Sequence, residues 1–220
     1  MPIDRTGHGT LIAAGRASQI FDLGDGRVLR RFKAGGNPDR EAMVMRHARK
    51  HGFPAPAVVE VGDDSLVLEQ IAGRTMLEVV LRRPWTLRRN ISILAALHER
   101  LHRIAAPPGL PAAADGRALL HLDLHPENVI LSPSGPVLID WTNARRGKPS
   151  LDVAMTWVIA ATSGGALGRV AMRLFLRHFD RAAVLAALPI AAELRISDPN
   201  VTAEERDAVR RLVVRASGGA

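Results

Sequence analysis

The chain of 220 residues contains no cysteine and no tyrosine, and only five phenylalanines. Without cysteine, a disulfide framework, a cysteine nucleophile and a cysteine-ligated zinc site are all excluded. Nothing near Met1 resembles a basic-then-apolar signal peptide, and no apolar run approaches the roughly 20 residues that span a bilayer. We therefore expect a cytoplasmic protein with no membrane partner.

The charge of the chain is strongly one-sided, with 30 lysines and arginines against 22 acidic residues and a formal net charge of +8. Such an excess can mark a nucleic-acid partner. Here the basic residues are scattered among alanine and leucine, and few aromatic rings are present to stack on bases. We attribute the charge to an arginine-rich composition and do not expect a nucleic-acid partner.

One stretch combines polar residues at an informative spacing: His121-Leu-Asp123-Leu leads to Asn128, and Asp140 follows twelve positions later. Apolar runs at 128–131 and 137–140 flank a Ser-Pro-Ser-Gly-Pro turn, which predicts a hairpin. This spacing is typical of the catalytic loop of kinase-type phosphotransferases, where the first Asp is the base and the Asn binds magnesium. Phosphoryl transfer depends mainly on positioning and charge neutralisation, so a carboxylate facing the acceptor and oxygen ligands for a metal suffice.

Hydrophobic periodicity divides the chain into a strand-rich first part and a helical remainder. The pattern predicts strands at 10–14, 18–23, 26–32, 60–61 and 65–69, with a helix from about 37 to 50. It then predicts helices near 75–83, 87–105, 150–162, 166–180, 181–195 and 203–216. Five strands and one helix followed by a helical remainder resemble the two lobes of the kinase fold. This resemblance implies an α+β, protein-kinase-like fold, with a small antiparallel sheet lobe over 1–73 that binds nucleotide and a helical lobe over 74–220 that carries the catalytic loop and substrate site.

From the strands around residue 15 to the segment 147–152, the chain resembles the aminoglycoside phosphotransferase family, relatives of choline kinase. The resemblance implies an enzyme that uses ATP and Mg²⁺ to phosphorylate an alcohol group of a small molecule. It implies that Asp123 is the catalytic base, that His121 braces the loop, and that Asn128 and Asp140 are the magnesium ligands. Asp152 would cap the next helix and hold the backbone of the catalytic loop.

The same resemblance implies a helix glutamate, Glu41, paired with a phosphate-binding cation on the third strand. The lysine usual at that strand position is replaced, with Arg30 as the first candidate and Arg31 and Lys33 as neighbouring ones. A guanidinium can also clamp phosphate oxygens.

Two further segments are candidate contacts for the nucleotide. The segment 66–73 resembles the hinge between lobes, which implies that backbone groups of Glu69 and Ile71 take the adenine. The loop 14–18 lacks the Gly-x-Gly-x-x-Gly pattern. Arg16 and Ser18 are candidate phosphate contacts, and an ordinary hairpin turn is the alternative.

Two other enzyme classes compete with this interpretation. His98-Glu99-x-x-His102 spells a zinc metallopeptidase motif. The extended form of that motif would need a glycine and a third histidine where this chain has Ala105 and Pro108, and the simpler explanation is an ordinary helix whose histidines flank its apolar stripe. A protein kinase is the closer alternative, but Asp-Phe-Gly and Ala-Pro-Glu are missing, so a small-molecule acceptor is favoured.

The charge of the expected substrate region bears on the acceptor. From 141 to 220 there are twelve lysines and arginines and seven acidic residues, a net charge of +5. A polycation should be met by carboxylates. We therefore expect a hydroxyl-bearing small molecule that is not a typical aminoglycoside.

Overall fold

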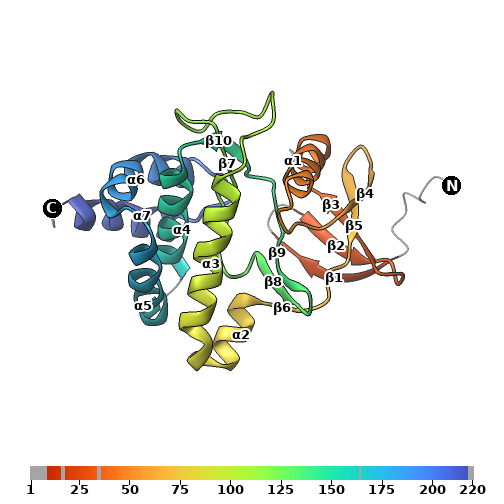
Figure 1. Cartoon of the computed structure of the whole chain (residues 1–220), viewed down its shortest axis with the longest axis horizontal. Helices are drawn as coiled ribbons and strands as arrows, with labels where there is room; N and C mark the ends of the chain where they lie inside the picture. The colour runs from red at the N-terminus through yellow and green to blue at the C-terminus, as the bar shows by residue number, and fades with distance from the viewer. Residues whose placement is uncertain (1–8, 16–17, 34–35, 164, 218–220) are drawn as a thin grey trace. The chain divides into compact units, whose positions relative to one another are not determined.

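The computed structural model of the protein describes residues 9–15, 18–33, 36–163 and 165–217 (Figure 1). The chain forms two compact units, one of Met1–Gly73 with Ile130–Thr142 and the other of Arg74–Val129 with Asn143–Ala220. Most of the hairpin that was predicted after Asn128 therefore groups with the first unit. No helix in the described ranges has both the length and the apolar character needed to cross a membrane.

The first unit is built on a five-stranded antiparallel sheet with the order β1-β2-β3-β5-β4. Its strands are β1 (Thr10–Ala14), β2 (Ser18–Asp22), β3 (Arg27–Phe32), β4 (Val58–Val61) and β5 (Ser65–Glu69). The turn between β2 and β3 contains Gly24 and Gly26, whose φ angles of 79° and 78° favour glycine. All five strands lie where the sequence pattern predicts them.

Helix α1 (Pro38–Lys50) contributes to the core of this unit and contacts β4 and β5. It begins where expected because the Asn37 side chain accepts a hydrogen bond from the Arg40 amide, with a proline at the first helical position. Its buried face includes Val44, Met45 and the acidic Glu41. A buried carboxylate on an otherwise apolar face indicates a specific polar partner.

The first unit also includes most of the hairpin of β8 (Val129–Ser132) and β9 (Gly135–Leu138). Gly73 lies against it, since a Cβ at that position would come within 2.5 Å of the Leu131 carbonyl oxygen. The Leu138 amide donates to the Pro54 carbonyl. Asp140 follows shortly after this strand.

The second unit is mainly helical, with α4 packed most extensively on α6 and also on α5 and α7. Its helices are α2 (Met76–Arg82), α3 (Leu87–His102), α4 (Pro149–Ser163), α5 (Gly165–Phe175), α6 (Arg181–Ile196) and α7 (Ala203–Ser217), with 3₁₀ turns η1 (Pro84–Thr86) and η2 (Leu176–His178). The buried residues of α4 include Leu151, Val153, Met155 and Val158. This helix is the apolar centre of the unit.

Three short strands were not predicted from the sequence: β6 (Arg74–Thr75), β7 (Ala118–Leu120) and β10 (Arg145–Gly147). Strands of two or three residues are too short to show a period-2 pattern. β7 and β10 pair antiparallel, so the segment before His121 pairs with a segment that follows the β8–β9 hairpin. Helices α3 and α5 end at His102 and Phe175, earlier than the predicted 105 and 180.

Candidate active site

The loop between β7 and β8 is held by a carboxylate from a helix thirty residues further along. Asp152 is fully buried in the first turn of α4, and its oxygens accept hydrogen bonds from the amides of His121 (3.1 Å) and Leu122 (2.7 Å). Leu122 has φ 59°, which is uncommon for a residue other than glycine. Asp152 lies within α4 rather than before it, so it does not occupy the expected capping position, and its two oxygens accept from the loop amides instead.

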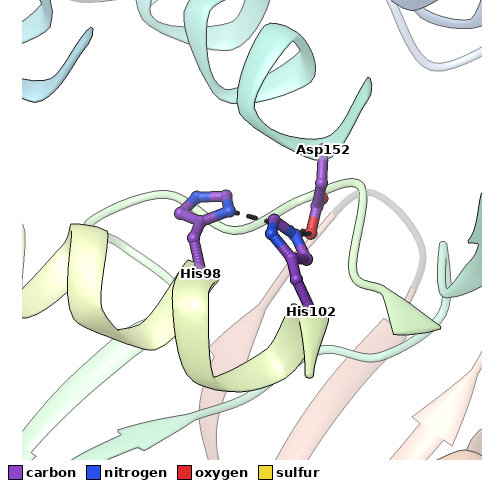
Figure 2. A group of neighbouring side chains, drawn as sticks. All are labelled: His98, His102 and Asp152. Carbon is purple, nitrogen blue, oxygen red and sulfur yellow. Dashed lines mark hydrogen bonds and ion pairs between the residues drawn. The ribbon is translucent and has the colours of Figure 1, made fainter. Parts of the chain in front are cut away.

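Two histidines of α3 complete the surroundings of Asp152 (Figure 2). His102 Nε2 donates to Asp152 Oδ2 at 3.0 Å, and His98 Nδ1 lies 3.7 Å from the same oxygen. Despite the cost of burial, the hydrogen bond from His102 holds the pKa of Asp152 far below its usual range. Burial lowers the pKa of His98 to about 3, so this imidazole is neutral at physiological pH. Asp152 is therefore an ionised carboxylate surrounded by hydrogen-bond donors.

The same three side chains match the spacing of a metal site, with one ligand atom from each within 4.8 Å of the others. Asp152 Oδ2, however, already accepts from the His121 amide and from His102, which must give up its proton to bind a metal. Glu99, the base in a metallopeptidase, is exposed while the three candidate ligands are largely buried. The geometry therefore favours hydrogen-bonded support of the loop over a peptidase site.

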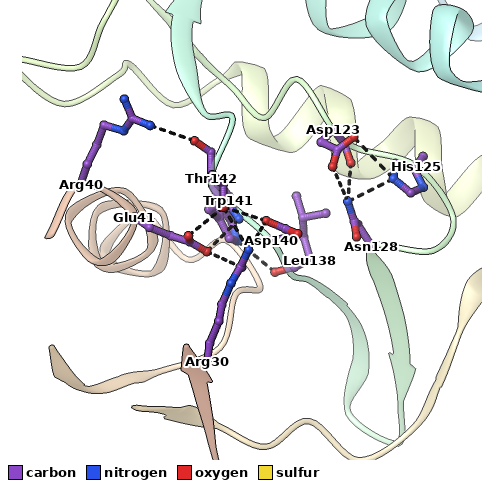
Figure 3. Close-up of polar contacts among 10 residues, drawn as sticks. All are labelled: Arg30, Arg40, Glu41, Asp123, His125, Asn128, Leu138, Asp140, Trp141 and Thr142. Carbon is purple, nitrogen blue, oxygen red and sulfur yellow. Dashed lines mark hydrogen bonds and ion pairs between the residues drawn. The ribbon is translucent and has the colours of Figure 1, made fainter. Parts of the chain in front are cut away.

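The polar side chains at the end of the loop face one another (Figure 3). Asn128 Nδ2 donates to the Asp123 carbonyl at 2.9 Å and to Asp123 Oδ2 at 3.0 Å. His125 Nε2 lies 3.5 Å from Asp123 Oδ1 and 3.2 Å from Asn128 Nδ2. Burial works to raise the pKa of Asp123, but contact with His125 outweighs it and holds the pKa below its ordinary value. With 19% of its side chain exposed, Asp123 is an ionised and accessible carboxylate.

In the first unit, a buried arginine joins two carboxylates from separate segments (Figure 3). Arg30 Nη1 donates to Glu41 Oε1 at 2.7 Å, and Nη2 donates to Asp140 Oδ1 at 2.6 Å. Thr142 Oγ1 bonds to both Glu41 and Asp140, and the Trp141 amide donates to Glu41. Burial raises the pKa of the Glu41 carboxyl, although Arg30 opposes the rise. Asp140 has φ 61° and a side chain 38% exposed, so part of its carboxylate is open to solvent.

The three candidate phosphate-binding cations, which lie on β3 or directly after it, have different partners in the structure. Arg30 is the one that reaches Glu41 and Asp140, and it is 4% exposed. The Arg31 guanidinium lies over the Phe21 ring, 5.3 Å from its centroid. Lys33 Nζ donates to the Gly15 carbonyl.

The other residues expected to meet the nucleotide are placed as follows. Ser18 is buried at the start of β2, and Arg16 lies outside the described residues. The Glu69 amide donates to the Ala57 carbonyl within the sheet. Ile71 follows Gln70, whose amide donates to Gly26.

The candidate metal ligands are distributed over the two units. Asp140 belongs to the first unit, and Asn128 belongs to the second. An amide oxygen and a carboxylate oxygen are the donors that Mg²⁺ prefers. The Asn128 nitrogen is engaged by Asp123, so its oxygen is the atom suited to a cation.

Two threonines of these networks were missed by sequence reasoning. Thr142 bridges Glu41 and Asp140, while Thr156 Oγ1 donates to the Leu124 carbonyl and bonds to His98 Nε2. Threonine carries no distinctive pattern in the sequence. Its position two residues after Asp140 is the only signal that could have drawn attention to Thr142.

Comparison with known proteins gives two curated relatives with partial matches. A probable serine/threonine-protein kinase, the BUD32 homolog of Archaeoglobus fulgidus, is 30% identical over 46% of this chain and 42% of its own length. Thiamine kinase of Escherichia coli is 35% identical over 38% of this chain and 28% of its own length. The matches thus span less than half of either relative.

Solved structures match over much more of the chain. A choline/ethanolamine kinase family protein from Mesorhizobium loti is 18% identical, with a TM-score of 0.62 over 99% of this chain and 90% of that one. The streptomycin-ATP ternary complex of the aminoglycoside phosphotransferase APH(2")-IIa is 15% identical, with a TM-score of 0.60 over 93% and 90%. These likenesses show the protein-kinase-like fold. The sequence profile of the phosphotransferase enzyme family matches residues 77–187, half of the chain, and the chain belongs to that family.

Proposed function

We propose that this protein transfers the γ-phosphoryl group of ATP to a hydroxyl group of a small molecule. The observation that carries the proposal is the catalytic-loop geometry, in which Asp152 holds two loop amides while Asn128 holds Asp123. Asp123 is then an ionised, partly exposed carboxylate on a braced loop. These are the properties required of a group that accepts a proton from an acceptor hydroxyl.

The proposed reaction is a single displacement. The acceptor hydroxyl gives its proton to Asp123 as its oxygen forms a bond to the γ-phosphorus. The bond between that phosphorus and the bridging oxygen to the β-phosphate breaks, and ADP leaves. Because the pKa of Asp123 is held below its ordinary value, the carboxylate is in the proton-accepting form at neutral pH.

The residues around Asp140 are suited to the phosphates. A magnesium ion bound with nucleotide would neutralise phosphate charge, and Asp140 and Asn128 carry the oxygen donors that it requires. Arg30 already bridges Glu41 and Asp140, so its guanidinium supplies fixed positive charge beside the metal-binding carboxylate. The names of structural relatives that bind ATP support use of a nucleotide.

The acceptor is proposed to be a small molecule other than a typical aminoglycoside. Relatives are named for thiamine and for choline or ethanolamine, which supports a small alcohol as acceptor. The net charge of +5 over 141–220 argues against a substrate carrying several ammonium groups. A protein acceptor, suggested by the name of the archaeal relative, is the second candidate.

The test is ATP consumption by purified protein with aminoglycosides, choline-like amines, sugars, nucleosides and a generic protein substrate side by side. Asp123→Asn is expected to bind nucleotide normally and to lose at least about 100-fold in kcat, because an amide cannot accept the proton. Asp207→Asn is the control, since this exposed carboxylate pairs with Arg210 on the surface of α7. Turnover by Asp123→Asn near that of the control would refute the role of Asp123.

A further inference from the structure

The second unit contains an apolar pocket of about 320 Å³ beside the catalytic loop. Helices α2, α3, α4 and α5 all contribute to its wall, as do His125, Pro126 and Glu127 of the loop. Its aliphatic lining includes Met76, Val80, Ile91, Leu94, Ile159 and Met172. All four helices belong to the second unit (Figure 1), so the pocket lies within a single compact body.

The size and lining of the pocket indicate the class of ligand. An apolar cavity of about 150 Å³ suffices to take up benzene, so this pocket holds roughly twice that amount of hydrocarbon. Two of its polar side chains are committed within the protein: Asn90 donates to Thr86, and Thr156 donates to the Leu124 carbonyl. Among the described residues that line it, Glu127 is the single carboxylate, and its side chain is 62% exposed. The pocket is therefore suited to an uncharged apolar group.

The position of the pocket connects it with the proposed base. His125 lines the pocket, and its Nε2 lies 3.5 Å from Asp123 Oδ1. One imidazole ring thus separates the pocket from the carboxylate. Leu81, which also lines the pocket, is 60% exposed, so apolar surface extends to solvent at this side.

We propose that this pocket binds the apolar portion of the phosphate acceptor, so that the substrate is an amphipathic alcohol. The proposal rests on the proposed phosphotransferase function and specifies its substrate class. The hydrocarbon part enters among α2, α3, α4 and α5, and the hydroxyl is left toward Asp123. Burial of apolar surface then supplies the binding free energy that carboxylates would supply for a polycation.

A homologous series of primary alcohols from 1-butanol to 1-octanol tests this in the full-length protein. With ATP and magnesium, the KM for the alcohol is expected to fall about fourfold for each added methylene until the pocket is filled, with little change in kcat. Binding of the same alcohols without ATP, measured by isothermal titration calorimetry, should follow the same trend.

Variants that fill the pocket from two different helices test whether the alcohols bind in this pocket. Ala160→Leu on α4 and Ala171→Leu on α5 both add carbon atoms at lining positions, and each should weaken 1-octanol binding at least tenfold. Ala161→Leu is the matched control, because the neighbouring Ala161 is exposed and does not line the pocket. Circular dichroism and thermal melts verify that each variant is folded. If one filling variant does not fold, the other still tests the proposal.

The outcomes separate the two proposals. Chain-length dependence in both KM and binding, lost in the filling variants and kept in the control, supports the inference. Turnover of other acceptors without any dependence on alcohol length would overturn the pocket assignment while leaving the phosphotransferase function intact. Alcohol binding with no phosphorylation of any tested hydroxyl compound would overturn the acceptor role and the proposed function together.

Discussion

Replacement of Asp152 by asparagine should destabilise the protein strongly, because one buried carboxylate satisfies three donors. It accepts from the amides of His121 and Leu122 and from His102 Nε2, at 2.7 to 3.1 Å, and it is fully buried. Asparagine keeps one acceptor oxygen but points an NH₂ group at donors, and it removes the charge. Hydrogen bonds to charged groups contribute about 1.5–3 kcal/mol each. Loss of one partner of a buried ionic cluster costs about 3–5 kcal/mol.

We therefore expect Asp152→Asn to lower the free energy of unfolding by about 4 kcal/mol, and to lower Tm by roughly 10 °C for a chain of this length. Urea unfolding followed by circular dichroism measures the difference. Asp180→Asn is the matched control, since the exposed Asp180 also accepts from two backbone amides, those of Ala182 and Ala183. Asparagine caps helices about as well as aspartate, so the control should change stability by less than about 0.5 kcal/mol.

The same variant should also lower kcat, because Asp152 keeps Leu122 at its positive φ and thereby positions Asp123. A stability difference below about 1 kcal/mol between Asp152→Asn and Asp180→Asn would refute the account of Asp152 as the anchor of the loop. If Asp152→Asn keeps full activity under conditions in which it is fully folded, the proposal that Asp152 positions Asp123 is refuted.

Two further perturbations test the buried groups. Burial lowers the pKa of His98 from 6.5 to about 3 in the folded protein. As the pH falls, the unfolded chain therefore takes up this proton at a higher pH than the folded protein does. The free energy of unfolding should then fall as the pH drops from 6.5 toward 3, by about 2 kcal/mol at pH 5. His98→Gln should remove this part of the slope in urea titrations at pH 7.5 and 5.0, and an unchanged slope would contradict the neutral imidazole. Arg30→Met leaves the buried Glu41 without its cation and should cost about 3–5 kcal/mol, whereas Arg31→Met should cost less than about 1 kcal/mol; equal losses would argue against the buried ion pair.

Local pattern in the sequence was sufficient to predict the sheet, helix α1 and the loop and hairpin that carry Asp123, Asn128 and Asp140. The strands of the first unit follow their apolar runs and turn residues, and Asn37-Pro38 marks a helix start by its own chemistry. The spacing from Asp123 to Asn128 is likewise a local property, and in the structure the two side chains are hydrogen-bonded. Such features depend on neighbours within a few residues, so they can be recognised before the fold is known.

Other features were decided by tertiary contacts between distant residues. The sequence left Arg30, Arg31 and Lys33 as alternatives for the phosphate-binding cation, and only the tertiary structure shows that Arg30 pairs with Glu41 and with Asp140, which is 110 positions away. The pocket is formed by side chains from four helices, and none of those helices has a motif of its own for it. These features arise from packing that brings remote segments together, and short-range periodicity carries no information about that packing.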